Sequence, residues 1–326
     1  MSANIQKTVT RLHGKIAEGQ YYEAQQQARV VAARYVKSQK WDAAVDLLHS
    51  VAQALLKAGQ GGSGGDLCLL LVDVFEKGEV RVDAESKGKV MGLLRLFERG
   101  EPTRKRFIGS MIGWSSKFSE FPAGDPELHH VAGSIYAEEH DPYEAERHLV
   151  LGTRDSPEVL ARMEYTWYKE NESHMAGDFA GRAVIPYLLV GNVRGANTAL
   201  RLFTEALCRD SGNLGAQEVS GQSGEVKIFP SIPLLNFLSL LLLAVQRGNA
   251  ELYKQLITKY SAHLKENGMW FDALDAIAEM YFGIKRPRQT NPLFDMMGSL
   301  LGGGGSAGAR RKPAARVEAP VAEGLD

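Results

Sequence analysis

The sequence predicts an all-α protein, an α-solenoid of stacked antiparallel helical hairpins with one short β-hairpin insertion in the C-terminal half. Apolar residues recur three or four positions apart in successive segments of helix length, separated by short polar or glycine-containing breaks. A pattern of an aromatic residue, an acid and an alanine follows three of these breaks, at Tyr22-Glu23-Ala24, Trp41-Asp42-Ala43 and Tyr143-Glu144-Ala145. The first two copies lie one helix plus one turn apart, which is the spacing of a repeat of helical hairpins. We expect the aromatic to wedge against the neighbouring helix and the alanine to permit close approach.

The first half of the chain is predicted to be a run of helices joined by short connections, so that neighbours run antiparallel. The second of them carries Ala24, Ala28 and Val31 on one stripe, as a buried helix face requires. Gly59–Gly65 then interrupts the pattern, and we expect Asp66 to cap the next helix by accepting free backbone N–H bonds. The predicted ranges are Ile5–Glu18, Tyr22–Lys37, Asp42–Lys57, Leu67–Lys77, Glu85–Glu98, Thr103–Ser119, Pro126–Glu139 and Tyr143–Leu151.

The second half continues the helical pattern around one extended stretch. Asp155-Ser156-Pro157, a capping residue with a proline in the first turn, predicts a helix start. Glu225–Phe229 is the only stretch of this half that looks extended, and we expect it to pair with Gln217–Ser220 across a turn. The other predicted helices are Met175–Val190, Val193–Arg209, Pro233–Gln246, Ala250–Leu264 and Trp270–Phe282.

Three regions are expected along the chain: residues 1–152, 153–301 and 302–326. The first two are the halves of the solenoid. The last is rich in Gly, Ala, Pro and charged residues with little to bury, which predicts a disordered tail.

The overall composition is that of an ordinary globular protein and excludes some function classes. Of the 326 residues, 44% are hydrophobic and 24% charged, so a buried core is feasible. Thirty-eight Lys and Arg balance 39 Asp and Glu, which argues against a dedicated nucleic-acid binder. Cys68 and Cys208 are too few for a disulfide scaffold, and buried thiols in a reducing cytosol are expected.

The sequence favours a cytosolic protein that does not insert into a membrane. Met1–Thr10 is polar and lacks the apolar stretch of a secretory signal. The most apolar run, Leu234–Val245, is about half the length that crosses a bilayer. Asn236 and Ser239 also interrupt it, so we expect a buried core helix.

No cofactor, metal or catalytic group is expected. Gly59–Gly64 fits G-x-G-x-x-G, but a strong helix precedes it where a dinucleotide site needs a strand. His129 and His130 are adjacent and would point about 100° apart on a helix, so they cannot share a metal. His148 lies one turn after Glu144, a spacing that is more often a solvated contact than a metal site.

Two surfaces are candidates for binding other proteins. The first two helices are rich in basic residues, and a charged edge there could be solvated or could dock a partner next to the glycine segment. The other lies around the expected hairpin, where apolar residues exceed what one packed face needs, which suggests a groove filled by another chain. The basic residues are Lys7, Arg11, Lys15, Arg29, Arg34 and Lys37, and the apolar ones Phe229, Ile232, Leu235, Phe237 and Leu238.

With these segments laid out, the chain resembles a known family, the scaffold subunit four of the guided-entry pathway for tail-anchored membrane proteins, in its fungal form. The resemblance extends from about Gly19 to Leu301. Its clearest stretches are Gly19-Gln20-Tyr21-Tyr22-Glu23-Ala24, Gln60-Gly61-Gly62-Ser63-Gly64 with Asp66-Leu67, Trp114-Ser115 with Lys117-Phe118-Ser119-Glu120, and Tyr143-Glu144-Ala145-Glu146-Arg147.

The resemblance implies a non-enzymatic bridge between two partners. The N-terminal half of such proteins docks the targeting ATPase, subunit three, and the C-terminal half holds subunit five, an adaptor with a ubiquitin-like domain. Carried onto this chain, the ATPase-binding residues are Tyr22, Arg29, Arg34, Tyr35, Lys57 and Asp66. The adaptor-binding residues are Ile228, Phe229, Leu235, Phe237 and Leu238. Gly59 stands where fungal members often have a second lysine, which puts a lysine regulatory contact in doubt.

Two alternatives of other classes stay open from the sequence. One is a nucleotide-dependent enzyme that uses Gly59–Gly65, and the other is a helical-repeat RNA-binding protein that uses the basic N-terminal helices.

Overall fold

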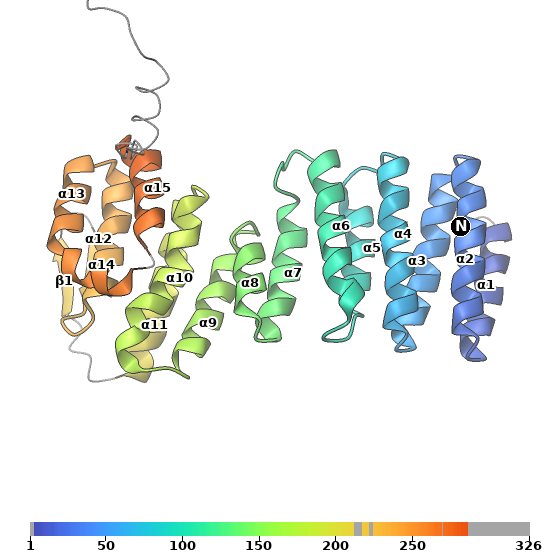
Figure 1. Ribbon diagram of the computed structural model, residues 1–326, viewed down its shortest axis with the longest axis horizontal. Helices are drawn as coiled ribbons and strands as arrows, with labels where there is room; N and C mark the ends of the chain where they lie inside the picture. Colours follow the sequence, from blue (N-terminus) through green and yellow to red (C-terminus); the bar gives the residue numbers. More distant parts are fainter. Residues whose placement is uncertain (1–2, 212–216, 222–223, 269, 286–326) are drawn as a thin grey trace, which may run out of the picture. The chain divides into compact units, whose positions relative to one another are not determined.

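Helices packed side by side make up nearly all of the computed structural model, which describes residues 3–211, 217–221, 224–268 and 270–285 (Figure 1). Most helices contact mainly helices one or two places away in the sequence, which is the contact pattern of a solenoid. The predicted all-α solenoid is therefore confirmed. The helices are α1 (Ala3–Ala17), α2 (Tyr21–Lys37), α3 (Trp41–Lys57), α4 (Gly61–Lys77), α5 (Ala84–Leu94), α6 (Pro102–Phe118), α7 (Pro126–Glu138), α8 (Pro142–Leu149), α9 (Ser156–Tyr168), the 3-10 turn η1 (Ser173–Met175), α10 (Ala176–Leu189), α11 (Val193–Asp210), α12 (Pro233–Arg247), α13 (Ala250–Lys259), α14 (Ser261–Asn267) and α15 (Phe271–Phe282).

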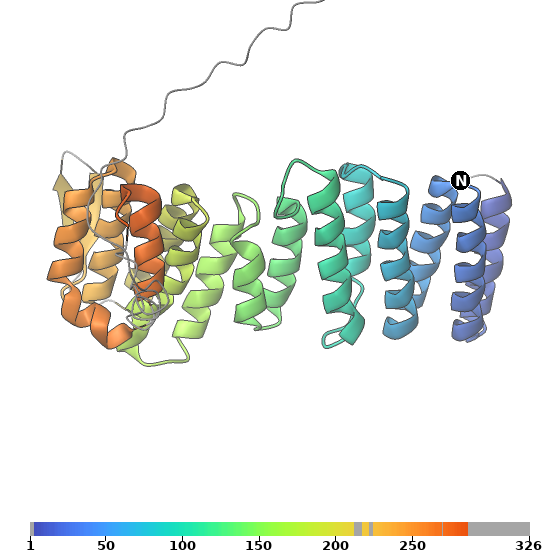
Figure 2. The ribbon, with the colours of Figure 1, turned by 45° about the horizontal axis from the view of Figure 1, so that its top comes forward.

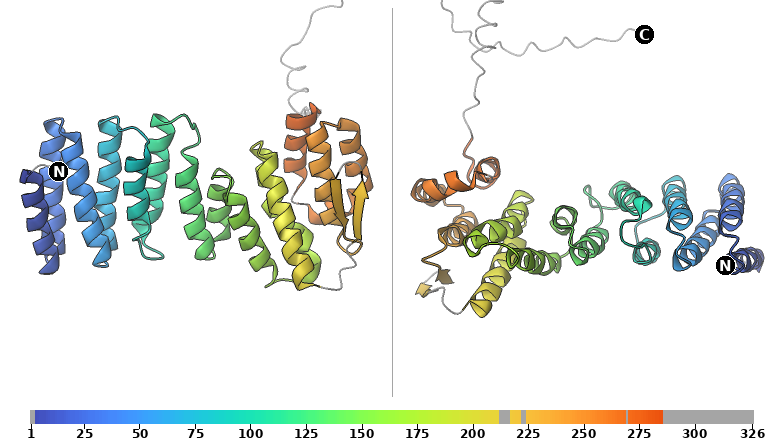
Figure 3. Two further views of the ribbon diagram at one scale, coloured as in Figure 1. Left: turned by 180° about the vertical axis from the view of Figure 1, so that it is seen from behind. Right: turned by 60° about the horizontal axis from the view of Figure 1, so that its bottom comes forward.

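Residues Met1–Ile284 form one structural unit. Within it, most successive helices run antiparallel (Figure 2), and a view close to the helix axes shows those of the first part alternating between two layers (Figure 3). The functional division after residue 152 stays a prediction. Residues 286–301 and the predicted tail at 302–326 lie outside the described residues.

The first helices repeat with a period of twenty residues. Helices α2, α3 and α4 begin at Tyr21, Trp41 and Gly61, and each is 17 residues long. Each helix end is followed by a residue with positive φ, after which an N–H group donates to the carbonyl five residues back at 2.8–2.9 Å. The positive-φ residues are Gly19, Gln39, Gly59 and Glu79. An identical turn thus closes four successive helices and sets their antiparallel course.

The three copies of the aromatic–acid–alanine pattern do not occupy the same positions in their helices. Trp41 is the first residue of α3, whereas Tyr22 and Tyr143 are the second residues of their helices. Only the first position packs inward: Trp41 lies against Gly78, while Tyr22 and Tyr143 are 66% and 67% exposed. What the helices share is a buried small residue at the fourth position. These residues are Ala24, Ala44, Gly64 and Ala145.

The glycine-rich segment is helix, which overturns the predicted loop at Gly59–Gly65. Helix α4 already begins at Gly61, and Gly64 and Gly65 are buried in it. A Cβ atom added to Gly64 would lie 2.7 Å from Leu56 Cγ, and one added to Gly65 would lie 2.1 Å from Thr103 Oγ1. The glycines therefore allow α3 and α6 to pack closely against α4. This packing outweighs the low helix propensity of glycine.

Alanine substitutions one turn apart in this segment should change the stability of the protein in opposite directions. Gly65→Ala is expected to destabilise the chain by about 1–3 kcal/mol, because the β-branched Thr103 cannot easily move aside. Gly62→Ala is the matched control: its position is exposed, with no atom within 4 Å of an added Cβ, and alanine should stabilise the helix by up to about 1 kcal/mol. Urea unfolding of both variants measures the difference, and a stabilised Gly65→Ala protein would contradict the packing role.

The predicted β-hairpin is confirmed, and it is anchored to α12. Strands β1 (Gln217–Gly221) and β2 (Gly224–Ile228) pair antiparallel, with Gln217 opposite Ile228. Just after β2, the Phe229 N–H donates to Asn236 Oδ1 at 2.8 Å, and Asn236 Nδ2 donates to the Phe229 carbonyl at 2.9 Å. Asn236 thus interrupts the apolar sequence of α12 in order to hold the backbone that follows the hairpin.

One predicted helix, Ala250–Leu264, is in fact two. Helix α13 ends at Lys259, and α14 starts at Ser261. Tyr260 lies at the break with φ −96° and ψ 11°, outside the α-helical region. Its ring packs against that of Phe237, with 5.6 Å between centroids, so burial of the tyrosine stabilises the bend.

Candidate functional site

A polar seam joins α2 to α4 at the predicted ATPase-binding surface. Asp66 forms an ion pair with Arg29 and accepts a hydrogen bond from Gln25 Nε2 at 2.8 Å. Ser63 Oγ donates to Gln25 Oε1 at 3.2 Å. Asp66 is the sixth residue of α4 and caps nothing, because the N-cap of this helix is Gln60. The predicted capping role of Asp66 is therefore wrong, and its carboxylate instead fixes a charged pair on the surface.

The six residues predicted to bind the ATPase are not all brought together. Tyr22 and Arg29 lie seven residues apart on one face of α2, and Arg29 reaches Asp66. Tyr35 lies about 20 Å further along the helix axis than Tyr22. Tyr22, Arg29, Arg34 and Lys57 are exposed, whereas Tyr35 and Asp66 are partly buried. All six residues stay a predicted interface.

Sequence reasoning missed two members of this seam, Gln25 and Ser63. A signal for Gln25 existed: it lies four residues before Arg29 and so shares its face of α2. Ser63 was hidden because its segment was interpreted as a loop.

The residues predicted to bind the adaptor lie mostly inside the protein. Phe229, Leu235, Phe237 and Leu238 are fully buried, and only Ile228 reaches the surface, with 36% exposed. The ring of Phe237 packs between Tyr260 and Trp270, with centroids 5.6 and 6.2 Å away. In this conformation four of the five side chains stabilise the fold and cannot contact a partner. Adaptor binding at this place stays a prediction, and Ile228 is the residue of the set that could make the contact directly.

His129 of α7 and His148 of α8 form a buried pair. His129 Nδ1 and His148 Nδ1 are 3.0 Å apart, and His129 Nε2 is 3.1 Å from the Ala123 carbonyl. When both rings are neutral, His129 Nε2 donates to Ala123, so His129 Nδ1 must accept from His148 Nδ1. The expected solvated contact of His148 with Glu144 is wrong, because His148 is buried against His129.

The histidine pair should make the protein sensitive to acid. Burial, followed by His129 and Arg147, lowers the pKa of His148 to about 4, and burial also lowers the pKa of His129. The unfolded chain therefore takes up protons as the pH falls below about 6.5, while the folded chain resists them. The stabilisation that comes from keeping His148 neutral is fully present above about pH 6.5. It is lost as the pH falls towards about 4, and the free energy of unfolding then decreases by about 3 kcal/mol.

Urea unfolding at a series of pH values from about 7 to about 4 measures this loss of stability. His148→Gln, which cannot take up the proton, should show a shallower loss over the same window, since the acidic residues remote from His148 are the same in both proteins. If the free energy of unfolding fell equally with pH in the two proteins, the histidine pair would not be the cause of the acid sensitivity.

A buried charge network links α8, α9 and α10. Arg182 forms ion pairs with Glu146 and with Glu164, and its Nε lies 3.3 Å from a Glu164 oxygen. Glu164 is 0% exposed, and neither of its oxygens has a well-aligned hydrogen-bond partner among the described residues. Burial and the adjacent Glu146 raise the pKa of Glu164 far above its usual range, against the opposing charge of Arg182. Glu164 is therefore more easily protonated than an exposed glutamate, and Arg182 is the group that favours its charged form.

Sequence reasoning missed this network, although part of its signal was present. Glu164 lies four residues after Leu160 and four before Tyr168, both of which are buried, so it falls on the apolar stripe of α9. Its partners lie 18 residues away on either side, and no local pattern connects them.

The glycine segment does not form a nucleotide site of the predicted alternative kind. Helix α3 precedes it and Gly61–Gly65 are helical, so these residues lack the strand and tight turn that present a pyrophosphate to a helix. None of the helices in the described part of the chain combines the length and apolarity that a bilayer crossing requires.

Comparisons with known proteins agree on one family. A family model described as Golgi to ER traffic protein 4 matches residues 38–301. Golgi to ER traffic protein 4 of Aspergillus fumigatus is 53% identical and covers 99% of both chains. The protein of that name from Schizosaccharomyces pombe is 35% identical over 90% of this chain and 95% of its own. A crystal structure of C. therm. Get4 has a TM-score of 0.86 and 59% identity, covering 95% of this chain and 100% of that one.

Proposed function

Because the chain belongs to the family described as Golgi to ER traffic protein 4, we propose that it is a non-enzymatic cytosolic scaffold that delivers tail-anchored membrane proteins to the endoplasmic reticulum. Its N-terminal half docks the targeting ATPase and its C-terminal half holds an adaptor with a ubiquitin-like domain. The scaffold promotes handover of the client between them.

The observation that carries this proposal is the full-length match to the Aspergillus relative, at 53% identity over 99% of both chains. The match includes α2–α4 and the hairpin with α12 alike, so both candidate surfaces are present in one chain. Such a row of helices suits a scaffold, because a solenoid offers a long surface on which separate partners can bind without overlap.

The chemistry of the two surfaces suits two kinds of interface, one transient and one more permanent. The surface on α2 and α4 is charged and exposed, as a rapid, salt-sensitive contact with a transient partner requires. The region around α12 is apolar, as in a more permanent interface. A stable adaptor complex would then recruit the ATPase reversibly.

Asp66→Lys is expected to weaken ATPase binding on the order of tenfold while the protein stays folded. The substitution replaces the Arg29–Asp66 ion pair by two like charges. This pair is more than one-third exposed on both sides, so its loss should change stability little. Titration of the purified chain with the ATPase measures binding, and ATP turnover of the ATPase reports its regulation.

Glu266→Lys is the control, because it makes the same charge change at an exposed position of α14. It should bind the ATPase like the unaltered chain. Normal binding and normal control of ATP turnover by Asp66→Lys would refute the surface assignment. If the unaltered chain bound neither the ATPase nor the adaptor, the proposed scaffold function itself would be refuted.

A further inference from the structure

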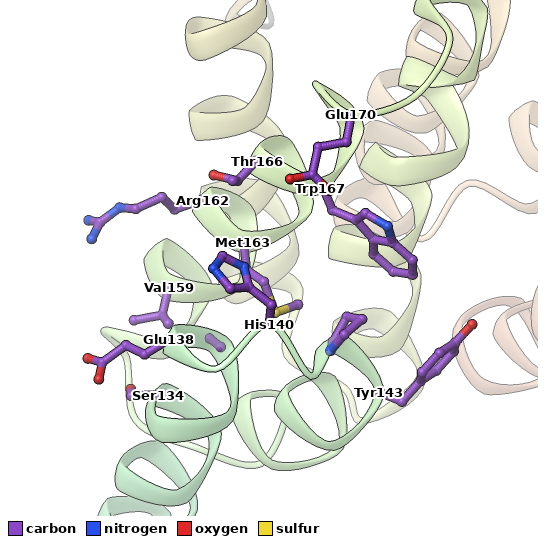
Figure 4. A pocket seen from close by; sticks show the side chains of 12 residues that line it. Ser134, Glu138, His140, Tyr143, Val159, Arg162, Met163, Thr166, Trp167 and Glu170 are labelled. Atoms are coloured by element: carbon purple, nitrogen blue, oxygen red, sulfur yellow. The ribbon is translucent and has the colours of Figure 1, made fainter. Parts of the chain in front are cut away.

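A pocket of about 770 Å³ lies between the end of α7, the start of α8 and the outer face of α9. It is separate from both surfaces described above. Figure 4 shows Trp167 and Tyr143 on one side and Val159, Arg162 and Glu138 on the other. Its volume falls in the range of roughly 300–1,000 Å³ that is typical of ligand sites. Its apolar lining residues are Ala137, Pro142, Tyr143, Val159, Met163 and Trp167.

The aromatic side of the pocket is held in place from behind. The rings of Tyr143 and Trp167 meet edge to face at 6.1 Å, and the guanidinium of Arg182 lies 5.1 and 4.7 Å from their centroids. Arg182 is itself fixed by Glu146 and the buried Glu164. A wall that is already ordered loses little conformational entropy when a ligand binds.

The polar groups around this apolar surface give it an excess of negative charge. Glu138 and Glu170 are exposed, and neither forms an ion pair with any other described residue. The one arginine of the lining, Arg162, is already paired with Glu158 at 2.5 Å. Ser134 Oγ is buried and has no hydrogen-bond partner among the described residues. The pocket therefore offers two carboxylates that no other described residue pairs with.

We propose that this pocket binds a peptide segment of another protein that carries a bulky apolar side chain next to a lysine or arginine. The apolar side chain would be buried against Tyr143, Trp167 and Val159, of which Tyr143 is 67% exposed and has most to gain from losing water. The basic side chain would pair with Glu138 or Glu170 at the rim, which fixes the direction of the peptide. This third surface is independent of the ATPase and adaptor assignments.

The test is selection of random dodecapeptides displayed on phage against the full immobilised chain. The expected result is enrichment of sequences with an aromatic or large aliphatic residue beside Lys or Arg. A fluorescein-labelled copy of the most enriched peptide then serves as the probe in anisotropy titrations. Its affinity should fall as salt rises, because the rim contacts are exposed.

Two pocket variants and one control locate the binding. Glu138→Lys combined with Glu170→Lys should weaken the probe at least tenfold, and Val159→Arg, which projects into the pocket, should do the same. Glu266→Lys combined with Glu279→Lys, an equal charge reversal at exposed positions outside the pocket, should bind it normally. All substituted positions are at least partly exposed, so each variant should give the circular dichroism of the unaltered chain.

Three results would overturn the proposal. One is enrichment of neutral or acidic peptides, or of none. Another is a probe that binds the pocket variants as well as the unaltered chain. The third is a dimer in analytical ultracentrifugation that the pocket variants lose, since the pocket would then bind a second copy of this chain.

Discussion

Replacing Phe237 with aspartate is expected to unfold the last helices of the described chain rather than only to remove adaptor binding. The Phe237 ring is fully buried between Tyr260 and Trp270. Loss of the ring costs about 3–5 kcal/mol, and an unpaired carboxylate in its place adds several kcal/mol. A protein is stabilised by about 5–15 kcal/mol in total, so this one change removes much of it.

Far-ultraviolet circular dichroism and limited proteolysis of Phe237→Asp measure the effect. The expected result is reduced helix content and rapid cleavage within α12–α15. A variant with unaltered helix content and melting temperature would contradict the core position of Phe237. Because an unfolded variant cannot report on an interface, loss of adaptor binding by Phe237→Asp alone would not identify the binding surface.

Ile228→Asp is the informative partner of this experiment. Ile228 is 36% exposed at the end of β2, so aspartate there should leave the helices intact. If the adaptor binds near the hairpin, this folded variant should bind it more weakly. Full binding by Ile228→Asp would move the adaptor surface away from the hairpin.

Replacing Arg182 with alanine is expected to destabilise the protein by about 3–5 kcal/mol, because it leaves Glu146 and the buried Glu164 without their cation. It also removes the guanidinium that lies over Tyr143 and Trp167. Urea unfolding of the full chain measures the change in free energy. Arg201→Ala, which breaks an exposed pair with Glu205 one turn away, should cost less than about 0.5 kcal/mol.

A second substitution separates charge from packing at this site. Glu164→Gln removes the acid that Arg182 compensates and keeps its shape. In the double variant the cost of removing Arg182 should therefore be smaller than in the single one. Equal costs in both backgrounds would mean that Arg182 acts through its contacts with the rings and Glu146 alone.

The sequence was sufficient where the signals are local. The period of three to four residues located the helices, and Asp155-Ser156-Pro157 marked the start of α9 correctly, although Asp155 makes no capping hydrogen bond. The hairpin followed from its extended residues and turn. Each of these features depends on neighbours a few residues apart, which a sequence displays directly.

Long-range packing explains most of the failures. Gly61–Gly65 reads as a loop by propensity, but Leu56 and Thr103 require glycine where they approach α4. Helix α12 seemed too apolar for one buried face. In fact it contacts α10, α11, α13, α14 and β2, and so buries several faces at once. The apparent excess of apolar residues was therefore core, and most of the predicted adaptor residues lie within it.

The twenty-residue spacing of the first turns has a consequence for insertions and deletions. Deleting one residue inside α3 would rotate everything after it by about 100° around the helix, and buried side chains would then face water. Removing or duplicating two such periods, which is one antiparallel pair of helices, would restore both the phase and the direction of every later helix. Natural or designed changes of length in this part of the chain should therefore be tolerated as whole modules and rejected as single residues.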